Sequence, residues 1–202
     1  NYIDNYKNIF SKAGLKLLAL EVEGMSLARS LTSNSPEATL IVDIGSRSTA
    51  MLVAENGLLK FAGQTDFGGS SLTQSLATAL NIASKRAEML KKQRGLTGLE
   101  NFAEKELSTQ LLTMLNVIIN EVQRFKNNYQ NNYRQTIDSI ILSGGGANLL
   151  GIEKYFAREV ELPSKKADSL APVDYPADLD LLRDELGPLL SVAIGLAMKG
   201  LQ

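Results

Sequence analysis

Three consecutive glycines, Gly144, Gly145 and Gly146, follow an apolar run in the stretch IILSGGGANLLG at residues 140–151. The apolar run predicts a buried strand, and glycines at the end of a strand permit positive φ angles and the close approach of another group to the backbone. One candidate for that group is a nucleotide or a phosphate. The other interpretation is a tight turn from a strand into a helix, and the triplet alone does not decide between them.

A second glycine motif lies in the segment IVDIGSRST, where a β-branched run ends in a carboxylate and hydroxyl residues follow. This pattern predicts a β-hairpin whose turn amides and hydroxyls can surround a phosphate. Asp43, at the end of the first strand, could hold Mg²⁺ directly or through a water molecule, because this ion binds carboxylate and phosphate oxygens. The alternative is a hydroxyl-rich turn in which neighbouring amides satisfy Asp43.

The composition excludes several kinds of chemistry. The chain has no cysteine and no histidine, which removes zinc sites of the usual type, thiolate chemistry and imidazole bases. The formal net charge is −1, from 21 basic and 22 acidic residues, so no overall field attracts nucleic acid or an anionic membrane. The first residues do not resemble a signal peptide, and the most apolar stretch, residues 189–198, is too short to span a bilayer. We therefore expect a cytoplasmic protein without a nucleic-acid partner.

Two common nucleotide-binding motifs are absent. No G-x-x-x-x-G-K-[ST] sequence occurs, and the first lysine after the glycine triplet is Lys154. The triplet is not a dinucleotide-binding fingerprint, because its strand comes late in the chain and no acidic residue follows at the required distance on a second strand. The sequence thus predicts neither a P-loop nor a Rossmann site.

Apolar spacing and breaker residues predict the secondary structure. The expected elements of the first part are a helix that ends at Gly14, a strand at residues 15–23, a helix at 24–33, and three meandering strands at 38–45, 49–56 and 58–66 with a hairpin turn at Asn56-Gly57. The second part is expected to contain a helix capped by Ser70 or Ser71, helices at 84–96 and 107–133, a strand before the glycine triplet, a helix at 151–160, a surface connection at 164–181, and a mostly buried closing helix with Pro188 in its first turn.

The order of these motifs is more specific than any one of them. The hairpin DIGSRST, the segment FGGSSLTQSLA, a helix with AEMLK, a long helix and then IILSGGGANLLGIEKY follow one another. This order resembles the second half of the actin-like ATPases and, within them, the PilM family of type IV pilus assembly proteins, which is related to the cell-division protein FtsA. The resemblance runs over nearly the whole chain and matches the C-terminal portion of that family.

The resemblance implies an α/β actin-like (ribonuclease H-like) fold, in which this chain forms the second lobe, a mixed sheet flanked by helices, and the first lobe is largely missing. Residues 1–36 would be a remnant of the first lobe and its inserted subdomain. Residues 37–202 would be the second lobe, with a helical subdomain at about 75–135. The chain departs from the family pattern because no second D-[IL]-G hairpin occurs in it.

The resemblance also implies a site for ATP or ADP with Mg²⁺ in the complete protein. Asp43 would lie near the metal ion and hold it directly or through a water molecule. The hairpin would lie near the β- and γ-phosphates, and the glycine triplet near the adenosine. Glu88 and Lys91 would approach the ribose and adenine from the other side, although they could equally form a solvated i,i+3 ion pair. The implied nucleotide-binding residues are Asp43, Gly45, Ser46, Arg47, Ser48, Thr49, Gly68, Gly69, Glu88, Lys91, Gly144, Gly145, Gly146 and Asn148.

For function, the resemblance implies a nucleotide-responsive scaffold at the cytoplasmic face of the inner membrane. Its partners would be a PilN-like inner-membrane protein, which docks through a short cytoplasmic tail, and other pilus assembly proteins. Hydrolysis would need a water held by both lobes, which implies at most a weak ATPase in the complete protein and none in this chain alone. Two alternatives stay open: an interaction module without nucleotide binding, and an enzyme of the sugar or carboxylate kinase type.

Overall fold

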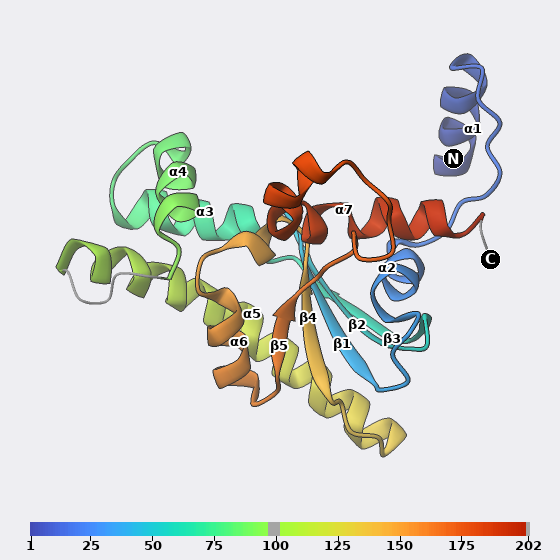
Figure 1. The fold of residues 1–202 in the computed structure, drawn as a ribbon. Coiled ribbons are helices and arrows are strands. Elements are labelled where there is room, and N and C mark those ends of the chain that lie inside the picture. The colour runs from blue at the N-terminus through green and yellow to red at the C-terminus, as the bar shows by residue number, and fades with distance from the viewer. Residues whose placement is uncertain (97–101, 201–202) are drawn as a thin grey trace.

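The computed structural model describes residues 1–96 and 102–200. Its centre is a five-stranded mixed sheet in the order β3-β2-β1-β4-β5 (Figure 1). Neighbours β3, β2 and β1 are antiparallel, whereas β4 is parallel to both β1 and β5. The strands are β1 (Thr39–Ile44), β2 (Thr49–Glu55), β3 (Leu58–Thr65), β4 (Ser139–Ser143) and β5 (Ser164–Lys166).

Helices cover both faces of the sheet. The larger core lies on the face covered by α5 (Phe102–Tyr133) and α6 (Ile152–Val160), where Leu40, Val42 and Ile44 of β1 are fully buried. Ile41 points to the other face, which is covered by α2 (Glu23–Thr32) and α7 (Arg183–Met198). Because β1 is buried on both faces, its sequence is a continuous apolar run rather than an alternation.

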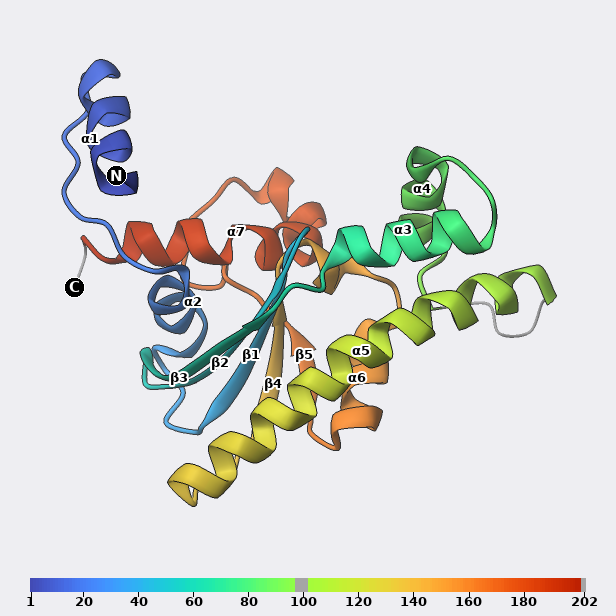
Figure 2. The same cartoon turned by 180° about the vertical axis from the view of Figure 1, so that it is seen from behind.

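The remaining helices extend from this sandwich. Helices α3 (Gly69–Ala79) and α4 (Ser84–Arg94) project beyond one end of the sheet together with the start of α5 (Figures 1 and 2). Helix α1 (Tyr2–Lys12) has no buried residue and stands apart from the sheet. In the described part of the chain, no helix combines the length and the hydropathy that a membrane span requires.

The structure confirms several turns that the sequence predicts. Asn56 and Gly57 both have positive φ, at 51° and 74°, as the hairpin between β2 and β3 requires. Gly14, with φ of 70°, follows α1 as expected. The three meandering strands are therefore confirmed together with their tight connection.

The prediction of a strand at residues 15–23 is wrong. Residues 15–22 have no regular secondary structure, and Leu15, Leu18 and Val22 are exposed. A strand needs backbone partners, and within residues 1–96 and 102–200 no sheet edge lies beside this segment. Helix α2, which lies within the region assigned to a first-lobe remnant, packs closely on α7. The division at residue 36 stays a prediction.

Two further expectations need correction in the C-terminal part. The connection at residues 164–181 contains β5, which pairs with β4, and most of a 3₁₀ helix, η2 (Ala177–Leu182). Helix α7 begins at Arg183, which places Pro188 beyond its first turn. This helix is also less buried than expected, because Leu189 and Leu196 are each 48% exposed. The sequence does not predict β5 because its residues are polar. A three-residue edge strand is held by backbone pairing alone and needs no apolar side chains.

The contact between α2 and α7 depends on Gly195. A Cβ at this position would overlap the backbone carbonyl of Ser26. Ser26 belongs to α2 and is fully buried. The glycine therefore allows the two helix backbones to touch, and this contact covers the face of the sheet that contains Ile41.

Gly195→Ala should destabilise the chain. Overpacking at a backbone contact should lower the free energy of unfolding by about 1–2 kcal/mol, even though alanine favours a helix by up to about 1 kcal/mol. Urea unfolding measures this change. Ala193→Ser, which also adds one atom but on the exposed side of α7, is the control and should change stability by less than about 0.5 kcal/mol. Equal stability of Gly195→Ala and the wild type would contradict the close contact.

A buried carboxylate connects residues 15–22 to the same pair of helices. The Glu21 side chain is only 3% exposed and accepts hydrogen bonds from Ser26 Oγ at 2.6 Å, Arg29 Nη1 at 2.7 Å and Lys199 Nζ at 2.5 Å. Arg29 also donates to the carbonyl of Gly195 at 2.7 Å. The hydrogen bond from Arg29, followed by those from Lys199 and Ser26, holds the pKa of Glu21 far below its ordinary value of 4.5.

This pKa shift predicts a pH-dependent contribution to stability. A carboxyl whose pKa is depressed by folding stabilises the folded state above its unfolded pKa, and the contribution is lost as pH falls through the folded pKa. Glu21→Gln should therefore be less stable than the wild type at pH 7, and the difference should shrink as pH falls below about 4.5. Thermal unfolding of both proteins between pH 7 and pH 3 measures the difference. A difference that stays constant with pH would contradict the assignment.

Candidate functional site

A cavity of about 650 Å³ lies at the carboxyl ends of the parallel strands β1 and β4, where α3, α4 and the start of α7 converge. Open sheets with parallel strands commonly bind ligands at this edge. The structure brings eight of the residues predicted from sequence to the cavity wall: Gly45, Ser46, Gly69, Glu88, Lys91, Gly145, Gly146 and Asn148. Six others lie outside the wall: Asp43, Arg47, Ser48, Thr49, Gly68 and Gly144.

The three glycines of the triplet have different roles. Gly144 has φ of 77°, and a Cβ there would lie 2.6 Å from the carbonyl oxygen of Ile44. A Cβ at Gly146 would overlap the Ile44 side chain. At Gly145, by contrast, a Cβ would meet only Leu189 Cδ2 at 3.6 Å, within the cavity. Two glycines thus serve the turn and the packing against β1, while Gly145 leaves space in the cavity.

The hairpin between β1 and β2 is hydrogen-bonded to the start of α3. The amides of Gly69 and Ser70 donate to the carbonyls of Gly45 and Ser46, at 2.9 and 2.7 Å, and the hydroxyls of Ser46 and Ser70 are 2.8 Å apart. A Cβ at Gly68 would lie within 2.8 Å of this hairpin. The prediction that Ser70 or Ser71 caps α3 is therefore wrong: the cap is Gly68, because hairpin carbonyls satisfy the amides of the first turn.

The other hairpin residues support the turn in different ways. The carbonyl of Ser48 accepts the amide of Gly45 at 3.0 Å, which closes the turn. Thr49 is fully buried, and its hydroxyl donates to the carbonyl of Phe67 at 2.8 Å. Arg47 is exposed. The hydroxyl of Ser46 is therefore the hairpin side chain that lines the cavity.

Asp43 lies at the end of β1, on the side of the sheet that faces α2 and α7 rather than on the cavity wall. Burial raises the pKa of Asp43, the neighbouring Ser143 hydroxyl acts in the opposite direction, and the charge of Glu23 raises the pKa further. Among the described residues, no group of three or more acidic side chains could hold a metal ion by itself. Asp43 is therefore a candidate oxygen ligand for a cation. Among the groups that shift its pKa, Glu23 is a second negative charge and none is a positive charge that would stabilise the carboxylate.

Glu88 and Lys91 form an ion pair, and that pair belongs to a network with α3. Lys91 Nζ lies 2.7 Å from Glu88 Oε2, 2.9 Å from the carbonyl of Gly69 and 2.8 Å from Thr73 Oγ1. Thr73 also contacts Glu88 directly. Burial opposes ionisation of Glu88, but the hydrogen bonds from Lys91 and Thr73 outweigh it, so the pKa of Glu88 lies below its ordinary value.

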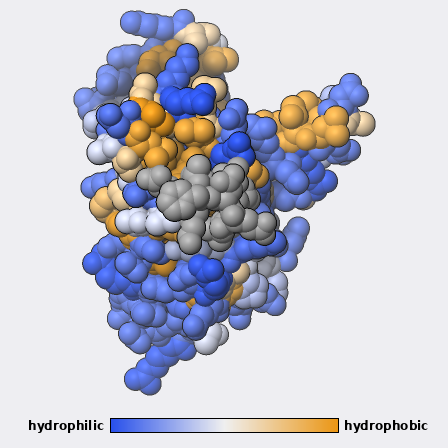
Figure 3. All heavy atoms as spheres, turned by 90° about the vertical axis from the view of Figure 1, so that its left-hand side faces the viewer, coloured by the Kyte–Doolittle hydropathy of each residue, from blue (hydrophilic) through white to orange (hydrophobic). Residues whose placement is uncertain are grey.

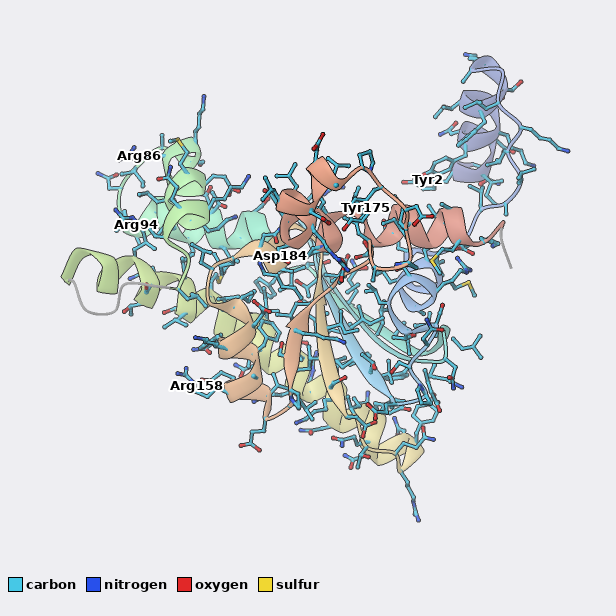
Figure 4. All side chains as sticks on the ribbon, viewed as in Figure 1. Tyr2, Arg86, Arg94, Arg158, Tyr175 and Asp184 are labelled. Carbon is cyan, nitrogen blue, oxygen red and sulfur yellow. The ribbon has the colours of Figure 1, made fainter. Side chains whose placement is uncertain are left out.

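Sequence reasoning missed several residues of the cavity wall. Positive charge comes from Lys92 and Lys166, and negative charge from Asp184 and Glu185 at the start of α7. Figure 4 shows Asp184 above the carboxyl ends of the central strands. The missed residues are Ser70, Leu72, Lys92, Leu149, Lys166, Leu181, Asp184, Glu185 and Leu189. If the closing helix had been predicted to begin at Arg183, its first turn would have contained these two carboxylates.

Asn148 connects the glycine turn to this acidic segment. Its Nδ2 donates to the backbone carbonyl of Glu185 at 2.9 Å, while its Oδ1 is buried and has no hydrogen-bond partner. The turn after β4 and the start of α7 are thereby joined behind the cavity wall. Pro188 adds to this link, since its carbonyl accepts the amide of Gly144 at 3.0 Å.

Solved structures of actin-like proteins match this fold. The PilM-PilN type IV pilus biogenesis complex matches over 99% of this chain and 58% of that chain, with a TM-score of 0.82 and 19% identity. MreB5 of Spiroplasma citri bound to ADP matches over 96% of this chain and 63% of that one, with a TM-score of 0.71 and 21% identity. EutJ from Carboxydothermus hydrogenoformans matches over 95% and 59%, with a TM-score of 0.67 and 23% identity. The actin-like α/β fold predicted from the sequence is confirmed.

Comparisons of the sequence agree with these structural matches. The cell division protein FtsA of Enterococcus faecalis is 28% identical over 91 residues, which are 44% of this chain and 21% of that protein. The matched residues thus cover about a fifth of this relative, and the chain covers less than two thirds of each of the matched chains in the solved structures. The model of the family described as type IV pilus assembly protein PilM matches residues 1–201, and the chain therefore belongs to the PilM family.

Proposed function

We propose that this chain contributes one wall of a site for ATP or ADP with Mg²⁺, in a protein that acts as a nucleotide-responsive scaffold in type IV pilus assembly. The single observation that carries the proposal is the cavity at the carboxyl ends of β1 and β4. Its volume of about 650 Å³ falls in the range of small-molecule sites, roughly 300–1,000 Å³.

The wall of the cavity fits a nucleotide. Gly145 and Leu189 form an apolar part of the wall against which a base would lie, and Ser46 and Ser70 present hydroxyls at the hairpin end. The lysines Lys92 and Lys166 supply positive charge at the wall. A structure of MreB5 bound to ADP shares this fold, which supports the same class of ligand here.

Asp43 lies outside the cavity wall, so the magnesium ion would be held between its carboxylate and phosphate oxygens that extend from the cavity past the hairpin. Mg²⁺ prefers hard oxygen ligands and usually takes one or two carboxylates plus substrate phosphates. The half-buried Asp43 carboxylate, which burial disfavours in its charged form, fits this role because a cation would stabilise that charge. The bound ion would neutralise phosphate charge, while this chain would position it through the end of β1.

The scaffold role extends the family assignment to a partner and a place. The solved complex of PilM with PilN contains a protein of the same family and the same fold. We infer that this chain belongs to a protein that binds a PilN-like partner and acts at the cytoplasmic face of the inner membrane, where nucleotide state would alter that contact. Any hydrolysis would be weak, and this chain alone would have none.

Gly145→Val tests the nucleotide site. The fold has room for a side chain at this position, but the two added methyl groups would occupy the space proposed for the nucleoside. In the complete protein that contains this chain, affinity for MgADP, measured by calorimetry with the wild type in parallel, should fall about tenfold or more, which corresponds to about 1.4 kcal/mol. Thermal stability should stay nearly unchanged. A folded variant with wild-type affinity, or a wild type that binds no nucleotide, would reject the nucleotide site.

Asp43→Asn tests the metal role. The substitution keeps the shape of the side chain but removes the charge that would hold Mg²⁺, and it relieves an unfavourably buried carboxylate. The increase in ADP affinity that Mg²⁺ produces in the wild type should therefore shrink about tenfold in the variant, whereas ADP affinity in EDTA should not change. Thermal stability at pH 7 should be equal or slightly higher. An unchanged magnesium effect would show that Asp43 does not hold the metal ion.

A further inference from the structure

All three hydrogen-bond donors of Lys91 have partners within the protein. An ammonium group has three N–H donors, and those of Lys91 are directed to Gly69 O, Thr73 Oγ1 and Glu88 Oε2 at 2.7–2.9 Å. The Lys91 side chain is only 11% exposed, whereas that of Lys92 is 74% exposed. Although both lysines line the cavity, only Lys92 has its ammonium group largely in solvent.

Two partners of Lys91 lie in the first two turns of α3, which supports the phosphate hairpin, and the third, Glu88, lies on α4 itself. Gly69 accepts from Lys91 through its carbonyl and donates through its amide to Gly45 of the hairpin at 2.9 Å. The next residue, Ser70, repeats this link to Ser46 through its amide and its hydroxyl. One side of the α3 start is thus attached to the hairpin, and the other side is attached to α4.

The groups form a closed network between the two helices. Thr73 accepts from Lys91, contacts Glu88 and lies one turn after Gly69, whose carbonyl is 3.0 Å from the Thr73 hydroxyl. Thr73 itself is 8% exposed and does not line the cavity. A charged donor that lies in such a network fixes the relative position of the elements that it joins.

We propose that Lys91 is a positioning residue, which sets the geometry of the phosphate hairpin through the first turn of α3 and thereby couples the α4 wall of the cavity to its phosphate end. This inference rests on the proposed nucleotide site and specifies how one part of that site acts. Displacement of α4 moves the Gly69 carbonyl, and with it the hairpin turn at Gly45 and Ser46. Lys92, not Lys91, is the α4 lysine that reaches a bound nucleotide.

Helix α4 is suited to such a movable wall. It has one buried residue, Ala87, and it projects beyond the sheet with α3. Figure 3 shows this end of the molecule, where hydrophilic and hydrophobic side chains are mixed in the upper half and hydrophilic ones predominate in the lower half. With little apolar burial of its own, α4 depends on polar contacts such as that of Lys91 for its position.

Lys91→Met and Thr73→Val test the proposal by two routes. Both substitutions keep the size of the side chain approximately. Lys91→Met removes the hydrogen bonds to Gly69 and Thr73, and Thr73→Val removes the contacts of Thr73 with Lys91, Glu88 and the Gly69 carbonyl. Residue-resolved amide hydrogen exchange of the chain should show about tenfold faster exchange at Gly69 and Ser70 in both variants, whereas Lys85→Met, an exposed lysine of the same helix, should leave these amides unchanged. Wild-type exchange at Gly69 and Ser70 in both variants would overturn the proposal.

Ligand binding to the complete protein distinguishes positioning from direct contact. Tripolyphosphate with Mg²⁺ probes the hairpin end, and adenosine probes the glycine-turn end. In both variants tripolyphosphate affinity should fall about tenfold while adenosine affinity changes less than about twofold. Loss of adenosine affinity in Lys91→Met alone, with normal tripolyphosphate binding, would mean that Lys91 contacts the nucleoside and would overturn the proposal. If the wild type binds neither ligand, the proposed function fails, and the exchange rates still decide the role of Lys91.

Discussion

The parallel pairing of β1 with β4 is the contact on which the rest of the site depends. Asp43 and Ser143 are opposite each other at the ends of these strands, so both following turns emerge at the same edge of the sheet. The second turn then folds back over Ile44, which is possible because Gly144 and Gly146 lack side chains. The hairpin, the glycine turn and the cavity between them are consequences of this one register.

Around this edge the chain uses backbone hydrogen bonds where a serine cap or a charged side chain would be expected. The start of α3 is satisfied by hairpin carbonyls, and the turn after β4 is fixed by the carbonyls of Glu185 and Pro188. Such contacts leave the side chains of Ser46, Ser70 and Lys92 at the cavity wall. Lys92 of α4 and Lys166 of β5 bring positive charge to the wall, and Asp184 and Glu185 of α7 bring negative charge. These opposite charges would orient a polar ligand in the cavity.

Much of this arrangement could be predicted from local sequence. The buried strand before the triplet, the Asn56-Gly57 turn and the order of the motifs lead to the actin-like fold because each has a local physical signal. The strand expected at residues 15–23 failed because apolar residues favour a strand only where a neighbouring strand exists. Strand β5 and the cap at Gly68 were missed for the converse reason: both are determined by backbone groups distant in sequence, which side-chain patterns do not report.

The same limit applied to the site. Eight predicted residues lie on one cavity wall, but the walls formed by Lys166 and by Asp184 and Glu185 follow from the positions of β5 and α7, which no local pattern fixed. For the triplet, the sequence left open whether the glycines serve a turn or a ligand. The structure assigns Gly144 and Gly146 to the turn and places Gly145 at the cavity.

The contact between α2 and α7 has a consequence for synthesis of the chain. Arg29 and the Gly195 carbonyl that it binds are 166 residues apart in sequence. While the ribosome is still producing the C-terminal helix, Ile41, Leu52 and Ala54 lie on a sheet face that α2 alone can only partly cover. Until α7 is made, this apolar face of the first three strands stays partly exposed, and transiently exposed apolar surface of this kind makes an incompletely folded chain prone to aggregation.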